Sequence, residues 1–362
     1  MKPDRKLILE DGSQYFGIGF GAEKDRVCEL VFNTSLVGYQ EILSDPSYTD
    51  QAVVLSYPLI GNYGICDEDF ESKLITPSAL IVRDRNENPS NFRATRTLEE
   101  ILQDNDVPGM YGVDTRKLVR SIRDLGSRRG LVTGADTTVE QGLEIISGTE
   151  IPHDAVKRCS CRKKWYSRTN NPRYQVVAVD CGMKTNIIKM LNRNRCNVTI
   201  VPWNTGSEEI LSLKPDGVFV SNGPGDPEDL PEVSGMLRNI RGKVPVFGIC
   251  LGHQLIALSC GAKTYKLKFG HRGGNHPVRD IRTGKIEITS QNHSYAVDEK
   301  SLSGTGLSVS HINILDGTVE GLYSDEDRMF SVQYHPESAP GPCDSSYLFE
   351  QFTKMMERTG DA

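Results

Sequence analysis

The chain has 362 residues, of which 37% are hydrophobic and 25% charged, enough for about two globular domains with cores of their own. Its formal net charge of −6 argues against nucleic acid as the main partner. No apolar run is long enough for a membrane helix, and the start "MKPDRKLILEDG" lacks the apolar core of a secretory signal. We therefore expect a cytoplasmic protein with no membrane contact.

Residues 1–150 predict a mixed α/β domain. Short strand-like runs, such as "AVVLSY" at 52–57 and "SALIVRD" at 78–84, alternate with turn clusters. The segment 113–126, "VDTRKLVRSIRDLG", has apolar residues at helical spacing and a stop signal at Gly126.

Residues 151–173 predict a linker, because they are basic, polar and without a sustained apolar period. This segment carries two of the nine cysteines, Cys159 and Cys161, close to His153. A zinc site there would lack a fourth ligand, so we predict no metal site in the chain. The cysteine count is odd and the cysteines are scattered, which favours free thiols in a reducing compartment over a disulfide framework.

Residues 174–362 predict a doubly wound, mainly parallel sheet. Buried strand-like runs at "YQVVAVD", "CNVTIVPW", "DGVFVSNG" and "VPVFGIC" alternate with segments of helical spacing. In such sheets ligands bind at the carboxyl ends of the strands. Three loops expected at those ends carry reactive or turn-forming residues, namely "SNGPGDP" (221–227), "GICLGHQ" (248–254) and "YHPES" (334–338).

Cys250 stands between Gly248 and Gly252, at a predicted turn from strand to helix. This pattern is typical of a nucleophile elbow, where a tight turn exposes the reactive side chain. A helix beginning at Leu251 would favour the thiolate form of the cysteine, and its first N–H groups could hold an oxyanion. Taken alone, the pentad is equally compatible with a packed structural cysteine.

His335 and Glu337 complete a possible catalytic triad. A spacing of two along an extended segment puts both side chains on one side, so the carboxylate can orient the imidazole. His253 is nearer to the cysteine in sequence, but we expect its ring to be turned away along the helix. Gly223 and Gly225 flank Pro224 in an exposed turn, and an amide there could face the oxyanion from the side opposite Leu251.

Together the three loops resemble the signature segments of class I glutamine amidotransferases, in the same chain order. Further segments resemble the small, glutamine-hydrolysing subunits of carbamoyl phosphate synthetases, over roughly residues 5–355. These segments are "VFNTSLVGYQEILSDPSYTDQ", "LSYPLIGNYGI", "VDTRKLVRSIRDLGSRRG", "LKFGHRGGNHPV" and "ITSQNHSYAV". The resemblance implies an amidotransferase domain over 174–362, preceded by the small-subunit domain over 1–150.

The resemblance also implies a role for each matching residue. Cys250 is the nucleophile, His335 the acid and base, and Glu337 its orienter. Backbone N–H groups of Gly223 and Leu251 are the implied oxyanion donors. The residues implied to bind glutamine are Ser47, Gly223, Gly225, Leu251, Gln254, Asn292, Ser294 and Tyr295. Some relatives have Gly-Phe where this chain has Ser294 and Tyr295. Because Ser47 lies in the first predicted domain, the implied site lies between the domains.

The implied reaction is hydrolysis of glutamine, with ammonia delivered to a large synthetase subunit. That partner would make carbamoyl phosphate from bicarbonate and ATP for pyrimidine and arginine biosynthesis. We expect no cofactor in this chain and place ATP and a divalent metal on the large subunit, since neither a P-loop nor a G-x-G-x-x-G motif is present.

Three alternative functions fit the sequence less well. A glutaminase of anthranilate or guanylate synthesis is disfavoured by the N-terminal 150 residues. A cysteine peptidase with a similar nucleophile elbow is a more distant alternative to glutamine hydrolysis. A non-catalytic regulatory subunit is disfavoured because all three catalytic residues are present.

Overall fold

The computed structural model describes residues 2–73 and 75–360. Contacts divide the chain into two compact units, which are described separately. Unit 1 consists of Met1–Pro152 and Lys268–Arg272, and unit 2 of His153–Leu267 and Gly273–Ala362. Among the described residues, no helix combines the length and the apolar character needed to cross a bilayer.

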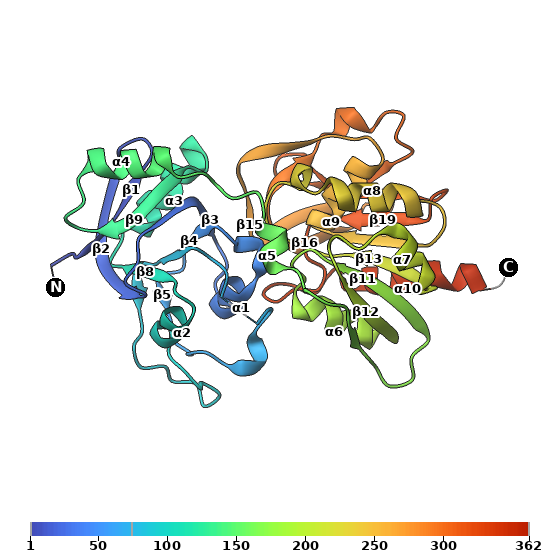
Figure 1. Ribbon diagram of the computed structural model, residues 1–362, viewed down its shortest axis with the longest axis horizontal. Coiled ribbons are helices and arrows are strands. Elements are labelled where there is room, and N and C mark those ends of the chain that lie inside the picture. Colours follow the sequence, from blue (N-terminus) through green and yellow to red (C-terminus); the bar gives the residue numbers. More distant parts are fainter. Residues whose placement is uncertain (1, 74, 361–362) are drawn as a thin grey trace. The chain divides into compact units, whose positions relative to one another are not determined.

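Seven strands of unit 1 form a closed barrel (Figure 1). Their order around the barrel is β1 (Arg5–Leu9), β2 (Gln14–Gly21), β8 (Pro108–Tyr111), β6 (Ala79–Ile81), β4 (Gln51–Leu55), β3 (Arg26–Asn33) and β9 (Arg129–Gly134). The helices of unit 1 are α1 (Tyr39–Ser44), α2 (Leu98–Asp104), α3 (Thr115–Leu125) and α4 (Val139–Gly148). Parallel pairs β3–β4, β4–β6 and β6–β8 stand beside antiparallel ones, so the N-terminal unit is of mixed α/β type.

Helix α3 shows how the local sequence sets an element of unit 1. The Asp114 carboxylate accepts a hydrogen bond from the N–H of Lys117 at 3.0 Å and caps the start of the helix. Leu118 and Ile122 bury one face against the barrel core. Gly126 then ends the helix at φ 100°, in the region that favours glycine. The helix predicted over 113–126 is therefore confirmed.

A short segment from late in the chain completes unit 1. The Lys268 carbonyl accepts from the N–H of Ser127 at 2.8 Å, and Phe269 stacks on Phe32 with ring centroids 5.9 Å apart. A Cβ on Gly126 would lie 2.9 Å from the Lys268 oxygen, so this close approach needs glycine. The sequence did not predict this return, because residues 268–272 lie inside the longer strand β15 (Thr264–Asp280) of the other unit's sheet.

Unit 2 is built on one ten-stranded sheet. Its order is β10 (Trp165–Ser167), β12 (Cys196–Pro202), β11 (Tyr174–Asp180), β13 (Gly217–Val220), β14 (Val246–Ile249), β19 (Met329–Val332), β18 (Val319–Ser324), β16 (Ile286–Val297), β15 and β17 (Ser308–Asn313). The five strands from β12 to β19 are parallel, as predicted. Beyond β19 the sheet continues with the antiparallel pairs β19–β18 and β18–β17, an extension that the alternation of strands and helices did not predict.

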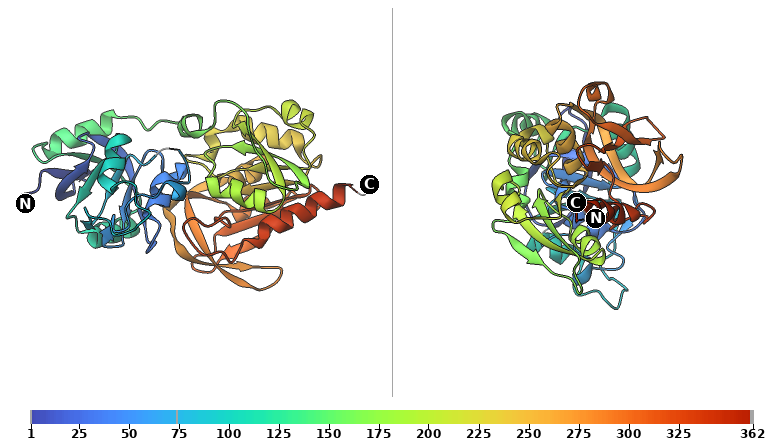
Figure 2. Two further views of the ribbon diagram at one scale, coloured as in Figure 1. Left: turned by 90° about the horizontal axis from the view of Figure 1, so that it is seen from below. Right: turned by 90° about the vertical axis from the view of Figure 1, so that its right-hand side faces the viewer.

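Helices cover both faces of the parallel strands, which makes this part of unit 2 doubly wound. Along β14, Val246 packs with α7 (Ser207–Ser212), α8 (Pro231–Ile240) and α9 (Leu251–Ser259). The next residue, Phe247, packs on the opposite face with α6 (Thr185–Arg193) and α10 (Tyr347–Gly360). Figure 2 shows α10 as the red helix that runs along the sheet toward the C-terminus. The alternation follows the two-residue period of a strand.

The segment predicted as a linker contains regular structure. It forms a short helix, α5 (Ala155–Cys159), and then β10, which pairs antiparallel with β12 as the outermost strand of the sheet. Exposed Trp165 and Tyr166 lack the apolar alternation of a buried strand, which is why β10 could not be predicted from the sequence pattern.

Candidate active site

Cys250 is the single residue between strand β14 and helix α9. Its φ of 54° and ψ of −103° lie outside the usual regions for a residue with a side chain. The Cys250 N–H donates to the carbonyl of Val332 on the neighbouring strand at 2.9 Å, which holds the turn in place. Cys250 is 2% exposed. This backbone is that of a nucleophile elbow, in which strain at one residue turns the reactive atom out of the sheet.

The glycines around Cys250 are required by close packing of the elbow. A Cβ on Gly252 would lie 2.2 Å from the carbonyl oxygen of Val220, and one on Gly248 would lie 2.7 Å from the carbonyl oxygen of Gly252. The N–H of Gly252 also donates to the Ser221 carbonyl at 3.1 Å. Helix α9 therefore lies directly against the end of β13, which brings the loop 221–227 beside Cys250.

Gly252→Ala is expected to lower the free energy of unfolding by about 1–3 kcal/mol, because the added methyl group must push α9 away from β13. The control is Gly235→Ala on helix α8, where an added Cβ would meet no atom of the described residues within 4 Å. That change should be neutral or stabilise by about 0.5–1 kcal/mol through helix propensity. Urea unfolding of both variants measures the difference, and equal stabilities would contradict the packing argument.

His335 and Glu337 follow strand β19 and form a buried pair. Nδ1 of His335 lies 2.7 Å from Oε1 of Glu337, and both side chains are at most 2% exposed. The N–H of His335 donates to the Ser290 carbonyl at 2.8 Å, which fixes the backbone of the loop. Since Nδ1 donates to the carboxylate, Nε2 is the nitrogen left to exchange protons with a substrate or a thiol.

The charge of Glu337 keeps the His335 imidazole protonated at neutral pH. Burial lowers the pKa of His335, but the Glu337 charge and hydrogen bonding with Cys250 and Glu337 outweigh it and raise the pKa to about 10. Nε2 has no partner of conventional hydrogen-bond geometry among the described residues, although the Cys250 side chain is near enough to affect this pKa. An imidazolium facing a thiol side chain can protonate a leaving amine.

Lys184 is a third member of this buried group, and no motif in the sequence singled it out. Its Nζ donates to Oε1 of Glu337 at 2.9 Å and to the carbonyl of Ser338 at 2.7 Å. Burial raises the pKa of Glu337, but the charges of Lys184 and then His335 outweigh it and lower the pKa to about 2. The sequence feature that could have pointed to Lys184 is its position just after buried strand β11, at the same sheet edge as the other loops.

Gly223 and Leu251, the expected oxyanion donors, lie next to one another. A Cβ on Gly223 would lie 2.9 Å from Cδ2 of Leu251 and 2.1 Å from the Cys181 carbonyl oxygen. Within the described part of the chain, no carbonyl accepts from the N–H of either residue. Both amides are therefore available at the elbow for a developing negative charge.

The structure brings several of the expected glutamine-binding residues together in unit 2. The Asn292 carbonyl accepts from Sγ of Cys250 at 3.5 Å. Gln254 donates from Nε2 to the Tyr295 carbonyl at 2.9 Å and to Gln333 at 3.0 Å, so its amide also braces the strand that carries Ser294. Gly225 has φ 89°, a turn conformation that favours glycine.

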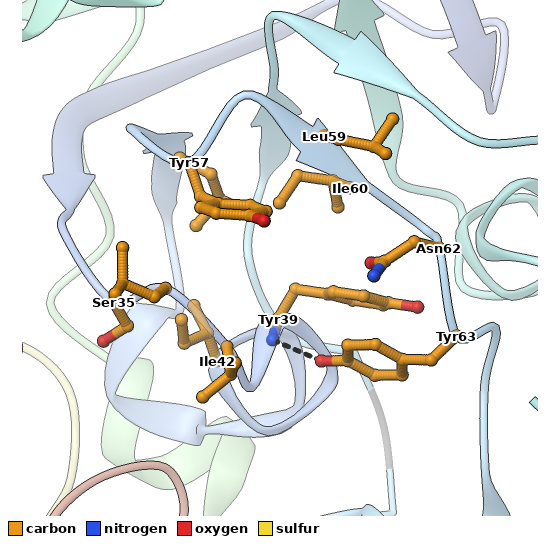
Figure 3. A pocket seen from close by; sticks show the side chains of 11 residues that line it. Ser35, Tyr39, Ile42, Tyr57, Leu59, Ile60, Asn62 and Tyr63 are labelled. Atoms are coloured by element: carbon orange, nitrogen blue, oxygen red, sulfur yellow. Dashed lines mark hydrogen bonds between the residues drawn. The ribbon is translucent and has the colours of Figure 1, made fainter.

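Ser47 belongs to unit 1, where it lies in the turn Pro46–Tyr48 after helix α1. Its N–H donates to the Asp45 carboxylate at 3.0 Å. The start of α1 is fixed by Tyr63, whose hydroxyl oxygen accepts from the N–H groups of Gly38 at 3.1 Å and Tyr39 at 3.0 Å. Figure 3 shows the stacked rings of Tyr39 and Tyr63 in the pocket beside this helix. The turn that carries Ser47 is thus held at the end of an anchored helix.

His253 is not placed to act as the base. Its side chain is fully buried in α9, with Nδ1 2.9 Å from the Ser331 hydroxyl. Burial, and then the neighbouring His311, lower the pKa of His253 to about 3, so its ring is neutral at physiological pH.

Known proteins match this chain over nearly its full length. The family model for glutamine amidotransferase class-I matches residues 177–355, and that for the carbamoyl-phosphate synthase small chain, CPSase domain, matches residues 7–132. The chain is 53% identical to the carbamoyl phosphate synthase pyrimidine-specific small chain of Halalkalibacterium halodurans, over 98% of this chain and 97% of that one. It is 51% identical to a carbamoyl phosphate synthase small chain of Staphylococcus epidermidis, over 99% and 97%. It is 50% identical to the pyrimidine-specific small chain of Bacillus subtilis, over 98% and 96%.

Proposed function

The chain belongs to the family of carbamoyl phosphate synthase small chains, and we propose that Cys250, His335 and Glu337 hydrolyse glutamine and that the ammonia passes to a large subunit. Family membership and the class I amidotransferase domain make it a glutamine-hydrolysing subunit. The observation that carries the residue roles is the buried group formed by Cys250 at its elbow, His335 and Glu337.

Cys250 attacks the side-chain amide carbon of glutamine as a thiolate, and the N–H groups of Gly223 and Leu251 hold the resulting oxyanion. His335 gives the proton on Nε2 to the amine as the C–N bond breaks, so that ammonia leaves and a glutamyl thioester remains. His335 then takes a proton from water, whose oxygen attacks the thioester and releases glutamate and the free cysteine. Glu337 accepts from Nδ1 throughout and keeps Nε2 directed at the reacting atoms.

We propose that the ammonia passes to a large synthase subunit, which joins it to bicarbonate with ATP and a divalent metal. The small-chain names of the relatives support such a partner. The pyrimidine-specific names of two of them favour pyrimidine biosynthesis as a use of the carbamoyl phosphate, beside arginine biosynthesis. Nine free cysteines favour a reducing compartment, in keeping with the cytoplasm.

The assay that tests this function supplies the chain and its large subunit with bicarbonate, ATP and either glutamine or ammonium. The complex should form carbamoyl phosphate from both nitrogen donors. The chain alone should release glutamate from glutamine but form no carbamoyl phosphate. If the complex makes no carbamoyl phosphate from either donor, the proposed pathway is wrong and only glutamine hydrolysis remains.

We propose that Ser47, Gly225, Gln254, Asn292, Ser294 and Tyr295 hold glutamine, together with the two oxyanion donors. Substitution of Ser47 tests this set most strictly, because only the family resemblance supports the role of Ser47 in glutamine binding. Ser47→Ala is expected to raise the KM for glutamine by at least about tenfold, the effect of one lost hydrogen bond to a polar ligand, with a smaller change in kcat. Thr49→Ala, in the same turn, is the control. An unchanged KM in Ser47→Ala would remove Ser47 from the site.

A further inference from the structure

Basic side chains gather in a segment of unit 2 that glutamine hydrolysis does not use. Residues 155–173 contain seven lysines and arginines and no acidic residue, in a chain whose net charge is −6. Arg158 is paired with Asp154 at 2.8 Å, and Arg173 with Glu357 at 2.9 Å. Among the described residues, no carboxylate forms an ion pair with the four cations between them, Arg162, Lys163, Lys164 and Arg168.

Two aromatic side chains stand among these cations. Trp165 is 43% exposed and Tyr166 is 54% exposed, both on strand β10. Successive side chains of a strand point to opposite faces, so the two rings flank the outer edge of β10, one on each side. We call these two residues, together with the four unpaired cations that adjoin them in the chain, the basic surface; all six are exposed. Trp, Tyr and Arg are the residues most enriched at the energetic centres of protein interfaces. Solubility alone does not account for the two exposed rings, because exposed aromatic side chains lower solubility.

The backbone of the basic surface is fixed to the sheet. The N–H of Cys161 donates to the Asp180 carboxylate at 2.8 Å, and the N–H of Thr169 donates to the side chain of Asn197 at 3.1 Å. Between them, β10 pairs with β12, with Trp165 opposite Ile200. Because the backbone is ordered before binding, less conformational entropy is lost when a partner docks.

We propose that the basic surface docks an acidic segment of the large subunit; the identity of this partner rests on the proposed function. Adjacent cations without counter-charges repel one another, and an acidic segment relieves that repulsion while it speeds encounter. Strand β10 is also the last strand of its sheet, so its outer edge can accept a strand from a polypeptide. Nucleic acid cannot use a strand edge in this way, so the edge favours a protein partner.

The test reverses charge at the basic surface and at a matched set of lysines. The first variant carries Arg162→Glu, Lys163→Glu and Lys164→Glu. The control carries Lys214→Glu, Lys243→Glu and Lys300→Glu, at exposed positions of the same unit. Each set of three reversals changes the net charge by 3 × −2, from −6 to −12. The dissociation constant for the purified large subunit is measured at 50, 150 and 300 mM NaCl, and glutamine hydrolysis by each isolated variant verifies folding.

The basic-surface variant is expected to bind the large subunit at least about tenfold more weakly than the control at 50 mM NaCl. The difference between the dissociation constants of the two variants should become smaller at 300 mM NaCl, because salt screens exposed charges. Equal dissociation constants for the two variants would overturn the proposal. Trp165→Ser with Tyr166→Ser, which keeps the charge, should also weaken binding, and wild-type affinity in that variant would likewise overturn it.

Two further outcomes separate this inference from the proposed function. If the wild-type chain does not bind the large subunit at all, the proposed partner is wrong and the docking claim falls with it. If a 20-nucleotide oligo(U) binds the control but not the basic-surface variant, while both variants bind the large subunit equally, the surface belongs to nucleic acid and the proposal is overturned.

Discussion

Cys250→Ser is expected to reduce the rate of carbamoyl phosphate formation from glutamine by at least about 10³-fold, and to leave the rate from ammonium close to that of the wild type. A hydroxyl is much harder to ionise than a thiol, so the covalent step is lost. The residue keeps nearly the same volume at a buried, strained position, so the elbow should remain folded. The partner's chemistry needs only ammonia, from whatever source.

The controls for this experiment come from the same region of the chain. His335→Asn should show the same split between nitrogen donors, because the proton on Nε2 is lost while the side chain remains polar. Cys260→Ser, at the far end of helix α9, should keep both rates within about twofold, as a substitution away from the reacting atoms. If Cys250→Ser retains its rate with glutamine, Cys250 is not the nucleophile.

The parallel core of unit 2 could be predicted because its signals are local. Each of the predicted strands from β11 to β14 is a short apolar run bounded by turn residues, and parallel strands bring their carboxyl ends to one edge. The register shows the result: Val220 lies opposite Gly248, and Gly248 opposite Ser331. Loops distant in sequence, around Gly223, Cys250 and His335, are thereby placed close together.

Other features could not be predicted, because they depend on contacts between distant segments. Residues 268–272 return to unit 1 through the carbonyl of Lys268 and the ring of Phe269. No local sequence pattern predicts that these two groups contact Ser127 and Phe32. Strand β10 exists because its backbone pairs with β12, although its side chains are exposed. In the sequence, Lys184 stands at the start of a predicted helix. Its hydrogen bond to Glu337 joins residues 153 positions apart, which no local pattern indicates.

Lys184 therefore gives the second test with a large expected effect. Lys184→Met removes the cation that holds Glu337 ionised, while the buried carboxylate remains. Breaking a buried ion pair in this way destabilises by about 3–5 kcal/mol at neutral pH. Because Glu337 then holds His335 less firmly, kcat should fall by about 10²-fold, the effect expected of a misplaced catalytic group, with a smaller change in the KM for glutamine. Lys189→Met, exposed on helix α6, which begins directly after Lys184, is the control and should change stability by less than about 0.5 kcal/mol.

The pH dependence separates this positioning role from general packing. The pKa of Glu337 is lowered in the folded protein from 4.5 to about 2, so its contribution to stability is present above pH 4.5 and is lost as the pH falls through 2. The pKa of His335 is raised from 6.5 to about 10, so its contribution is present below pH 6.5 and is lost as the pH rises through 10. Without Lys184 the pKa of Glu337 should rise, and the stability gap between wild type and Lys184→Met should therefore shrink as the pH falls below 4.5. Urea unfolding at pH 7, 5 and 3.5 measures that gap, and a gap that stays constant would mean that Lys184 acts through packing and not through the charge of Glu337.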